Sequence, residues 1–189
     1  TINQNPYDIL RHIAAFKADV IGFSCYIWNI EMTCHIISLV KDVFPKTKVF
    51  VGGPEVSYTA RKVLEDCPQI DYVLQGEGEV MVPDFLTALE KGGDGTEIPG
   101  VLGRIDGTIK GDETFQEIDD LDSLPFPYEN QDFRDLDHRI MYYESSRGCP
   151  FHCQYCLSGM NDRVRFRSVP LVLQELQAFV DAGVSQVKI

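Results

Sequence analysis

The chain has 189 residues, 44% of them hydrophobic, which is enough for one complete domain and part of a second at roughly 100–200 residues per domain. With 29 Asp and Glu against 17 Lys and Arg, its formal net charge is −12, and this disfavours nucleic acid as a partner because phosphate backbones require a basic surface. No apolar run approaches the ~18 residues that span a bilayer, and the first residues lack the features of a signal peptide, so we expect a cytoplasmic protein without a membrane span.

The first half of the chain alternates helical patterns with short apolar strands. Apolar residues recur at helical spacing over residues 8–16, and the continuous apolar run at 20–25 favours a strand buried on both faces. Asn29 is suited to cap a second helix, whose apolar face includes Ile36, Ile37, Val40 and Phe44. Further strands are expected at 49–51 and 72–74, and further helices at 59–65 and 79–89. This alternation predicts an α/β fold with a doubly wound parallel sheet.

Glycine-rich or small residues follow each predicted strand. In open parallel sheets, ligands bind outside the carboxyl ends of the strands, where glycines let a ligand approach the backbone closely. We therefore predict a ligand site at this edge, although such turns are also common as purely structural elements. The three loops are Ser24-Cys25, Gly52-Gly53-Pro54-Glu55 and Gly76-Glu77-Gly78-Glu79.

The periodicity changes in the second half. Apolar segments at 101–105 and 108–110 flank Asp106-Gly107, a strong signal for a two-residue hairpin turn, and we expect this hairpin to be a small appendage. An acidic segment containing Leu124-Pro125-Phe126-Pro127 predicts an extended linker. A strand at 141–144, a helix at 169–182 and the start of a strand at 186–189 then begin a new unit. We predict three parts: an α/β domain at 1–111, a linker at 112–139, and an incomplete second domain at 140–189.

Three cysteines, Cys149, Cys153 and Cys156, follow the strand at 141–144 in the pattern Cys-x-x-x-Cys-x-x-Cys. Soft thiolates at this spacing favour zinc or an iron–sulfur cluster. A structural zinc site requires four protein ligands, and the fourth would be His152, which lies between two of the cysteines. Three thiolates on a four-iron cluster would instead leave one iron open for chemistry. The other cysteines, Cys25, Cys34 and Cys67, are expected to be small, semi-buried thiols.

This cysteine pattern, with Tyr155 just before the third cysteine, resembles the signature of the radical S-adenosylmethionine superfamily. The resemblance implies a [4Fe-4S] cluster on the three cysteines, with the open iron holding S-adenosylmethionine. It also implies one-electron cleavage to a 5′-deoxyadenosyl radical, Tyr155 near the adenine, and a barrel of which this chain holds only the first βα unit. A further segment, Arg165-Phe166-Arg167-Ser168, also resembles a part of this family's sequence. Its alternative interpretation is a solvated loop.

Three further motifs narrow the resemblance to one subfamily. They are Val51-Gly52-Gly53-Pro54-Glu55, Gly76-Glu77-Gly78-Glu79 and Leu124-Pro125-Phe126-Pro127. Together with the cysteines they resemble the cobalamin (B12)-binding-domain radical enzymes, which include anaerobic magnesium-protoporphyrin IX monomethyl ester oxidative cyclases. This resemblance implies a Rossmann-like domain that binds cobalamin near the strand-end loops. The cobalamin contacts that it implies are Ser24, Gly52, Gly53, Gly76, Glu77 and Gly78. The Asp-x-His-x-x-Gly motif that supplies a cobalt ligand in other cobalamin domains is absent, so no histidine of this chain is expected on cobalt.

The function that these resemblances imply is radical chemistry on a large organic substrate, either the oxidative cyclisation of a porphyrin or methyl transfer to an unactivated carbon. An electron donor such as flavodoxin or ferredoxin would be a partner. We expect the chain alone to be inactive, because a (β/α)₈ barrel needs roughly 200 or more residues. Two alternatives remain open: a methylthiotransferase with a second cluster on Cys25, Cys34 and Cys67, and a non-catalytic cobalamin- or zinc-binding module.

Overall fold

The computed structural model describes residues 4–128, 139–157 and 163–189. The chain divides into two compact units, residues 1–117 and 118–189, which are described separately below. The predicted linker at 112–139 has its first residues in the first unit and residues 118–128 in the second, while 129–138 lie outside the described residues. The predicted domain boundaries stay a prediction.

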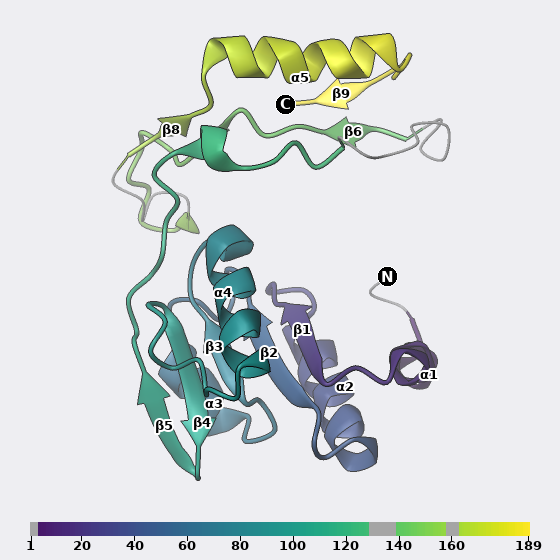
Figure 1. The fold of residues 1–189 in the computed structure, drawn as a ribbon, viewed down its shortest axis with the longest axis vertical. Coiled ribbons are helices and arrows are strands. Elements are labelled where there is room, and N and C mark those ends of the chain that lie inside the picture. Colours follow the sequence, from purple (N-terminus) through teal and green to yellow (C-terminus); the bar gives the residue numbers. More distant parts are fainter. Residues whose placement is uncertain (1–3, 129–138, 158–162) are drawn as a thin grey trace. The chain divides into compact units, whose positions relative to one another are not determined.

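The first unit is built on a five-stranded sheet with the strand order β1-β2-β3-β4-β5 (Figure 1). The first three strands are parallel, and β4 and β5 each pair antiparallel with the strand before. The predicted α/β fold with a parallel sheet is thereby confirmed, with an antiparallel extension. Its elements are α1 (Pro6–Phe16), β1 (Val20–Ser24), α2 (Ile30–Val43), β2 (Lys48–Gly52), α3 (Ala60–Asp66), β3 (Tyr72–Leu74), α4 (Gly78–Glu90), β4 (Val101–Ile105) and β5 (Thr108–Gly111).

Helices cover both faces of this sheet. On one face α2 buries a stripe spaced by about one helical turn, which packs with α1 and α3 against buried strand residues such as Val49 and Val51. On the other face α4 packs alone, and the Phe85 ring meets Phe50 and Tyr72 edge-on at centroid distances of 5.5 and 4.9 Å. Figure 1 shows α4 in front of the sheet and α2 and α3 behind it. The buried stripe of α2 is Thr33, Ile36, Ile37 and Val40.

The hairpin β4–β5 belongs to the main sheet and is more than the small appendage expected from the sequence. Its turn is the predicted one, since Asp106 and Gly107 both have positive φ (52° and 77°), as a two-residue Asp-Gly turn requires. In the antiparallel register of β3 and β4, Gly103 lies opposite Tyr72. A Cβ on Gly103 would lie 2.6 Å from the Tyr72 ring. The hairpin therefore covers the edge of β3 and makes it an interior strand.

The second unit contains one complete strand–helix–strand unit. Strand β6 pairs in parallel with β9, and β7 pairs antiparallel with β8. Phe179 of α5 is the centre of its core, and the rings of Phe126 and Tyr128 pack against it at 5.4 and 5.2 Å. The segment predicted as a linker thus supplies core residues to this unit. Its elements are a 3-10 turn (Leu121–Ser123), β6 (Met141–Tyr142), β7 (Ser146–Arg147), β8 (Arg165–Phe166), α5 (Val169–Asp181) and β9 (Val187–Lys188).

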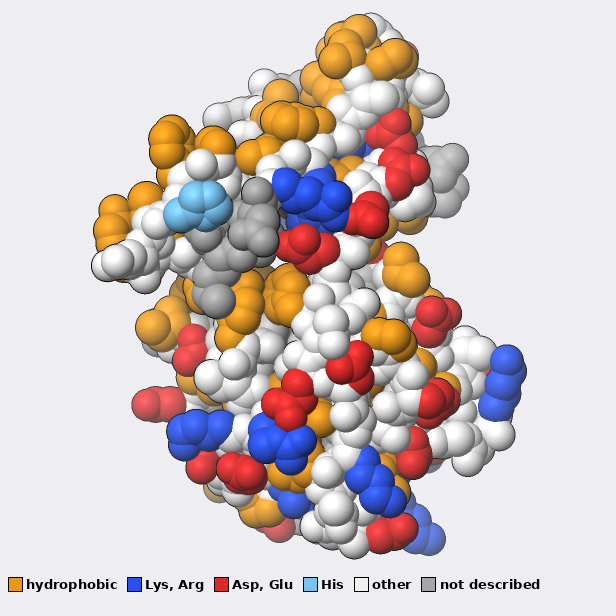
Figure 2. Space-filling model, turned by 90° about the vertical axis from the view of Figure 1, so that its left-hand side faces the viewer, with side chains coloured by type: hydrophobic (Ala, Val, Ile, Leu, Met, Phe, Trp, Pro, Cys, Tyr) orange, Lys and Arg blue, Asp and Glu red, His pale blue; other side chains and the backbone are white. Residues whose placement is uncertain are grey.

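Charged side chains of both signs are interspersed over the surface. On the face drawn in Figure 2, Lys and Arg lie among Asp and Glu and form no continuous basic area. This distribution agrees with the acidic composition. None of the helices in the described parts of the chain has the length and apolar character needed to cross a membrane.

Candidate functional site

The three strand-end loops meet at the carboxyl edge of the parallel strands, as the sequence predicts. Ser24 lies opposite Gly52 in the register of β1 and β2. The backbone N–H of Cys25 donates to the carbonyl of Gly52 at 2.7 Å, and the N–H of Gly76 donates to the hydroxyl of Ser57 at 3.3 Å. The loops are therefore hydrogen-bonded to one another, and we call them together the strand-end edge.

Two glycines of the strand-end edge are required by the protein's own backbone. Gly53 has φ +104°, and a Cβ there would lie 2.7 Å from the carbonyl oxygen of Cys25. Gly76 has φ +111°, and a Cβ there would overlap the backbone of Gln116. The N–H of Glu77 also donates to the carbonyl of Gln116 at 2.9 Å. Their packing against backbone explains why glycine is needed at these two positions, and the ligand contacts expected at Gly53 and Gly76 stay predictions.

Asn29 shapes the loop that follows β1. Helix α2 begins directly after it, as predicted, but its side chain does not cap the helix. Instead the side-chain oxygen of Asn29 accepts a hydrogen bond from the N–H of Tyr26 at 2.7 Å, and its amide group donates to the carbonyl of Ser24 at 2.9 Å. These two bonds close the turn that carries residues 26–28.

Two exposed aromatic residues, Trp28 and Tyr58, lie in the strand-end loops, each stacked on a half-buried ring, and the sequence argument missed them. The rings of Tyr26 and Trp28 stack at 4.6 Å with an interplanar angle of 9°, and Trp28 remains 59% exposed. Tyr58 stacks on Phe115 at 5.0 Å. We call these four residues the edge aromatics. Flat aromatic faces open to solvent suit a large planar ligand. The signal was available: Tyr26 and Trp28 directly follow a strand at the predicted ligand edge.

Histidine is absent from the strand-end loops at 24–29, 52–59 and 75–77. His12 lies in α1 and His35 in α2. The expectation that no histidine of this chain ligates cobalt stays a prediction.

The cysteine loop, residues 148–157, follows β7. Gly148 has φ +98°, and a Cβ there would overlap the backbone of Arg163, so the loop is fixed at its base. Beyond it, Cys149 is half-buried and Cys153 and Cys156 are exposed. The N–H of Cys156 donates to the carbonyl of Cys153 at 3.0 Å, which brings these two residues into one turn. The thiols of this loop are accessible to an external ligand.

Within the described residues, no group of three His, Cys, Asp or Glu side chains is close enough to hold a metal ion. Tyr155, predicted to lie near an adenine, is 93% exposed. The roles of Cys149, Cys153, Cys156 and Tyr155 therefore stay predictions. The donor set itself fits a thiophilic centre, because three thiols lie in one short loop.

Arg165 and Arg167 are buried, so the solvated-loop interpretation of this segment is wrong. The guanidinium of Arg165 donates to the carbonyl of Ile118 at 2.5 Å, and that of Arg167 donates to the carbonyl of Leu124 at 2.6 Å. These bonds attach the segment at 118–124 to strand β8. They hold the second unit together next to the cysteine loop.

Glu175 of α5 completes this buried group. It is only 4% exposed and lies 3.2 Å from the guanidinium of Arg167, while the hydroxyl of Tyr143 donates to it at 2.5 Å. Burial, together with the bond to Glu175, raises the pKa of Tyr143, so the phenol stays protonated. The buried carboxylate is thus paired on two sides.

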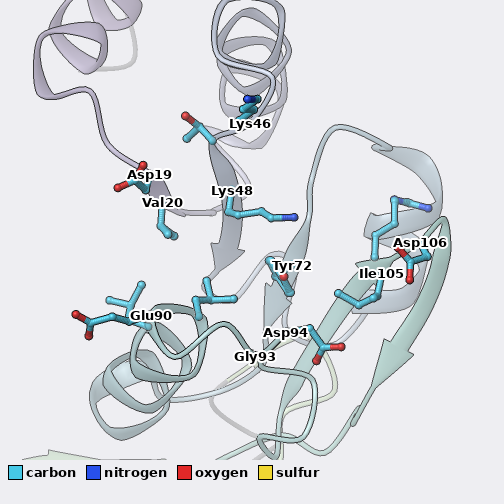
Figure 3. Close-up of a pocket in the computed structure, with 14 residues that line it drawn as sticks. Asp19, Val20, Lys46, Lys48, Tyr72, Glu90, Gly93, Asp94, Ile105 and Asp106 are labelled. Carbon is cyan, nitrogen blue, oxygen red and sulfur yellow. The ribbon is translucent and has the colours of Figure 1, made fainter.

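A cavity of about 790 Å³ lies at the opposite, amino edge of the first unit (Figure 3). Lys46 and Lys48 line it together with Asp19, Glu90 and Asp94. Lys48 begins β2 and Glu90 ends α4, while Asp19, Lys46 and Asp94 lie in the loops beside these elements (Figure 3). None of the predicted site residues lines this cavity, and its mixed charge selects no single class of ligand.

Comparison with known proteins finds a family match within the first unit. Residues 1–86 match the family model of the B12 binding domain. This match covers β1, β2 and β3 with the three loops of the strand-end edge. The part of the chain with the hydrogen-bonded glycine loops is thus the part that resembles cobalamin-binding proteins.

Curated relatives extend the similarity through the cysteine loop. The chain is 31% identical over 149 residues to the cobalamin-dependent radical SAM methyltransferase TokK of Streptomyces tokunonensis, covering 74% of this chain and 22% of that protein. It is 25% identical over 182 residues to the anaerobic magnesium-protoporphyrin IX monomethyl ester cyclase of Rubrivivax gelatinosus, covering 91% of this chain and 33% of that protein. The chain spans 22–38% of the length of the first curated relatives that it matches.

A solved structure has the same fold. The cobalamin-dependent S-adenosylmethionine radical enzyme OxsB, determined with aqua-cobalamin and S-adenosylmethionine bound, superposes with a TM-score of 0.75 at 20% identity. The superposition covers 96% of this chain and 26% of that one.

Proposed function

The chain is a relative of the B12-binding radical S-adenosylmethionine methyltransferases and cyclases, and we propose that it is part of an enzyme that uses both cofactors to methylate carbon. In this proposal the first unit binds cobalamin at the strand-end edge, and the cysteine loop binds a [4Fe-4S] cluster. The observation that carries the proposal is the B12-domain match over residues 1–86, followed in one chain by the three-cysteine loop.

The edge aromatics support cobalamin as the ligand of the first unit. The exposed part of the Trp28 ring, which is held by stacking on Tyr26, offers an apolar surface of the kind that a corrin ring covers. Ser24, Gly52, Gly53, Gly76, Glu77 and Gly78 would frame the ligand as loop backbone. Because these loops contain no histidine, the cobalt would receive no imidazole from them.

The cysteine loop supports the cluster. Cys149, Cys153 and Cys156 would each ligate one iron through a thiolate, and the exposure of two of them leaves room for the cluster to form. Tyr155 would pack beside S-adenosylmethionine. When bound, the cluster and S-adenosylmethionine would supply one-electron chemistry and cobalamin would carry the methyl group. The chain's own residues would hold the cofactors, the three thiolates at the cluster and the strand-end edge at cobalamin.

Oxidative cyclisation is the second candidate reaction, because the cyclase of Rubrivivax gelatinosus matches 91% of the chain. Methyl transfer is preferred because the relative with 31% identity is named a methyltransferase. A cyclase would take a porphyrin, whereas a methyltransferase would take another organic substrate with an unactivated carbon. Either reaction requires a small electron-transfer protein as donor.

Cobalamin binding is tested directly on the 189-residue chain. Hydroxocobalamin is titrated into the protein under anaerobic conditions, unbound ligand is removed by gel filtration, and the visible spectrum of the protein fraction is recorded. We expect about one cobalamin per chain, with a spectrum that lacks the signature of histidine coordination. A protein fraction that retains no cobalamin would contradict the assignment of the first unit.

The reaction is tested on a protein extended to the length of the relatives. After anaerobic reconstitution with iron and sulfide, it is incubated with S-adenosylmethionine, cobalamin and a reductant. We expect about four irons per chain and formation of S-adenosylhomocysteine, the product of methyl donation. Conversion of magnesium-protoporphyrin monomethyl ester without methyl donation would favour the cyclase instead, and a colourless protein with one zinc would exclude both.

A further inference from the structure

Two cysteines outside the cysteine loop lie in contact. The Sγ atoms of Cys34 and Cys67 are 3.5 Å apart. Cys34 belongs to α2, and Cys67 is the residue at which α3 ends. Both side chains are half-buried, so a small solute has access to the pair. Neither thiol has a role in the proposed cofactor sites.

The surroundings favour an intramolecular reaction of this pair. Helices α2 and α3 pack against the same face of the sheet and share one core, so the distance between the two thiols is set by the fold. A disulfide needs an S–S distance of about 2.05 Å, and rotation about the Cα–Cβ bonds is the ordinary way to close a gap of this size. The pair is therefore preorganised for bond formation.

We propose that Cys34 and Cys67 form a modification site at which a peroxide closes a disulfide between α2 and the end of α3. One thiolate attacks a peroxide oxygen, breaks the O–O bond and becomes a sulfenic acid, with release of one water. The second thiol attacks that sulfur, the S–S bond forms, and a second water leaves. Two thiols and one hydrogen peroxide thus give one disulfide and two waters, and the two sulfurs supply both electrons.

Cys25 lies close enough to Cys67 to interact with it electrostatically, but it differs from the pair in access. Its side chain is completely buried in the core beside the strand-end edge, and the sulfur–sulfur contact found in the described part of the first unit joins Cys34 to Cys67. The reaction is confined to the pair that touches.

The pair differs from fast redox sensors. Burial, followed by the hydrogen bond with Cys67, raises the pKa of Cys34 to about 12, whereas sensor cysteines have a lowered pKa. The disulfide would therefore accumulate under sustained oxidation and act as a stabilising cross-link. Helix α2 begins directly after the loop that carries Tyr26 and Trp28, so the cross-link restrains the helix that supports these two aromatic residues.

The test uses the 189-residue chain, treated with hydrogen peroxide, alkylated and digested with trypsin. Cleavage at lysines releases residues 18–41, with Cys25 and Cys34, and residues 63–91, with Cys67. We expect these peptides to be joined, with a mass about 2 Da below the sum of their masses. We also expect the thermal unfolding midpoint to rise by about 5–10 °C and to return after dithiothreitol.

Three variants assign the bond. The linked peptide should persist in Cys25→Ala and disappear in Cys34→Ser and Cys67→Ser, and both serine variants should keep the midpoint of the reduced protein when peroxide is added. If the two peptides are recovered separately with alkylated thiols, the proposal is overturned. It is overturned equally if the link survives in Cys34→Ser and is lost in Cys25→Ala.

Discussion

The strand-end edge of the first unit and the cysteine loop of the second both consist of glycine-containing turns that follow strands. They differ in how far contacts with the protein's own backbone fix their conformation. At the strand-end edge, the loops hydrogen-bond to one another, and Gly53 and Gly76 pack against backbone of the same unit. In the cysteine loop, only the base at Gly148 is packed in this way, and Cys153 and Cys156 are exposed.

This difference separates two ways of making a binding site. The strand-end edge is organised by folding, because its glycines are needed for chain packing with or without a ligand. The thiols of the cysteine loop lie beyond its packed base, so a bound metal centre would supply the remaining order. Substitutions of the packed glycines at the first site should therefore change stability, and substitutions of the thiols at the second should change metal content.

The largest effect is expected from the cysteines. In the extended, anaerobically reconstituted protein, Cys149→Ala, Cys153→Ala or Cys156→Ala should each lower the iron content from about four to below about one per chain. Cleavage of S-adenosylmethionine should fall below detection, because three thiolates are the minimum that anchors the cluster. Iron analysis and product quantification measure both quantities.

Cys67→Ala is the matched control for these variants, because it removes one thiol outside the loop and should keep the iron content. The unfolding midpoint of the first unit should be unchanged in all three loop variants. If Cys67→Ala loses iron as well, the cluster has been assigned to the wrong cysteines.

Gly76→Ala should cause the next largest effect, this time on stability. A Cβ there overlaps the backbone of Gln116 at a positive φ, and strain and overpacking together should cost about 3 kcal/mol. Gly92→Ala is the control: φ is +81°, but no atom lies within 4 Å of the added Cβ, so about 1 kcal/mol is expected. Urea unfolding of both variants measures the difference, and equal losses would show that packing at Gly76 has been overestimated.

The sequence predicted the fold well because its signals are local. Alternating apolar runs and helical spacing placed the elements from α1 to α4, and Asp106-Gly107 placed the hairpin turn. The attachment of that hairpin to β3 was not predictable in the same way. It depends on Gly103 making room for Tyr72 from a distant part of the chain, and neither residue shows this pairing locally.

The sequence predicted where the candidate site lies, but it did not predict what its individual residues contact. The rule that ligands bind at the carboxyl edge of parallel strands brought the three loops to one edge, as the structure has them, but it did not predict that Gly53 and Gly76 pack against backbone of the same unit. Likewise, the sequence left Arg165 and Arg167 open between a family motif and a solvated loop, because the carbonyls of Ile118 and Leu124 that accept their hydrogen bonds lie more than forty positions earlier. Long-range partners decide what a glycine or an arginine does, and composition does not reveal them.

Alkaline pH should weaken the first unit by a smaller amount. Burial raises the pKa of Cys25 to about 11, and the pKa of Cys34 is raised to about 12, while unfolded thiols titrate near 9. The folded state holds these protons more tightly, so the stabilisation is complete below pH 9 and is lost as the pH rises towards 11–12. The free energy of unfolding should therefore fall over this range.

Urea unfolding at several pH values between 8 and 11 measures this loss. Cys25→Ala should reduce the slope of stability against pH, whereas Cys153→Ala, which lies outside the first unit, should leave it unchanged. An identical slope in Cys25→Ala and the unchanged protein would mean that another group controls the alkaline transition.

Trp28→Ala should give the smallest effect. It should lower the affinity for cobalamin, whereas Gly76→Ala should lower the stability of the fold. The Trp28 ring is 59% exposed and stacks only on Tyr26, so its removal should change the unfolding midpoint little. Loss of one aromatic contact with a corrin ring should raise the dissociation constant for hydroxocobalamin about tenfold, which corresponds to about 1.4 kcal/mol. Spectrophotometric titration of the chain measures it.

Phe16→Ala is the control, because Phe16 is 82% exposed at the end of α1, just before the amino end of β1. It removes a comparable aromatic surface far from the carboxyl edge and should leave cobalamin affinity unchanged. If both variants bind equally well, the edge aromatics do not contact the ligand, and the strand-end edge would hold cobalamin through its backbone alone. If Trp28→Ala weakens binding and keeps the midpoint, folding organises the strand-end edge while side chains presented on it provide affinity.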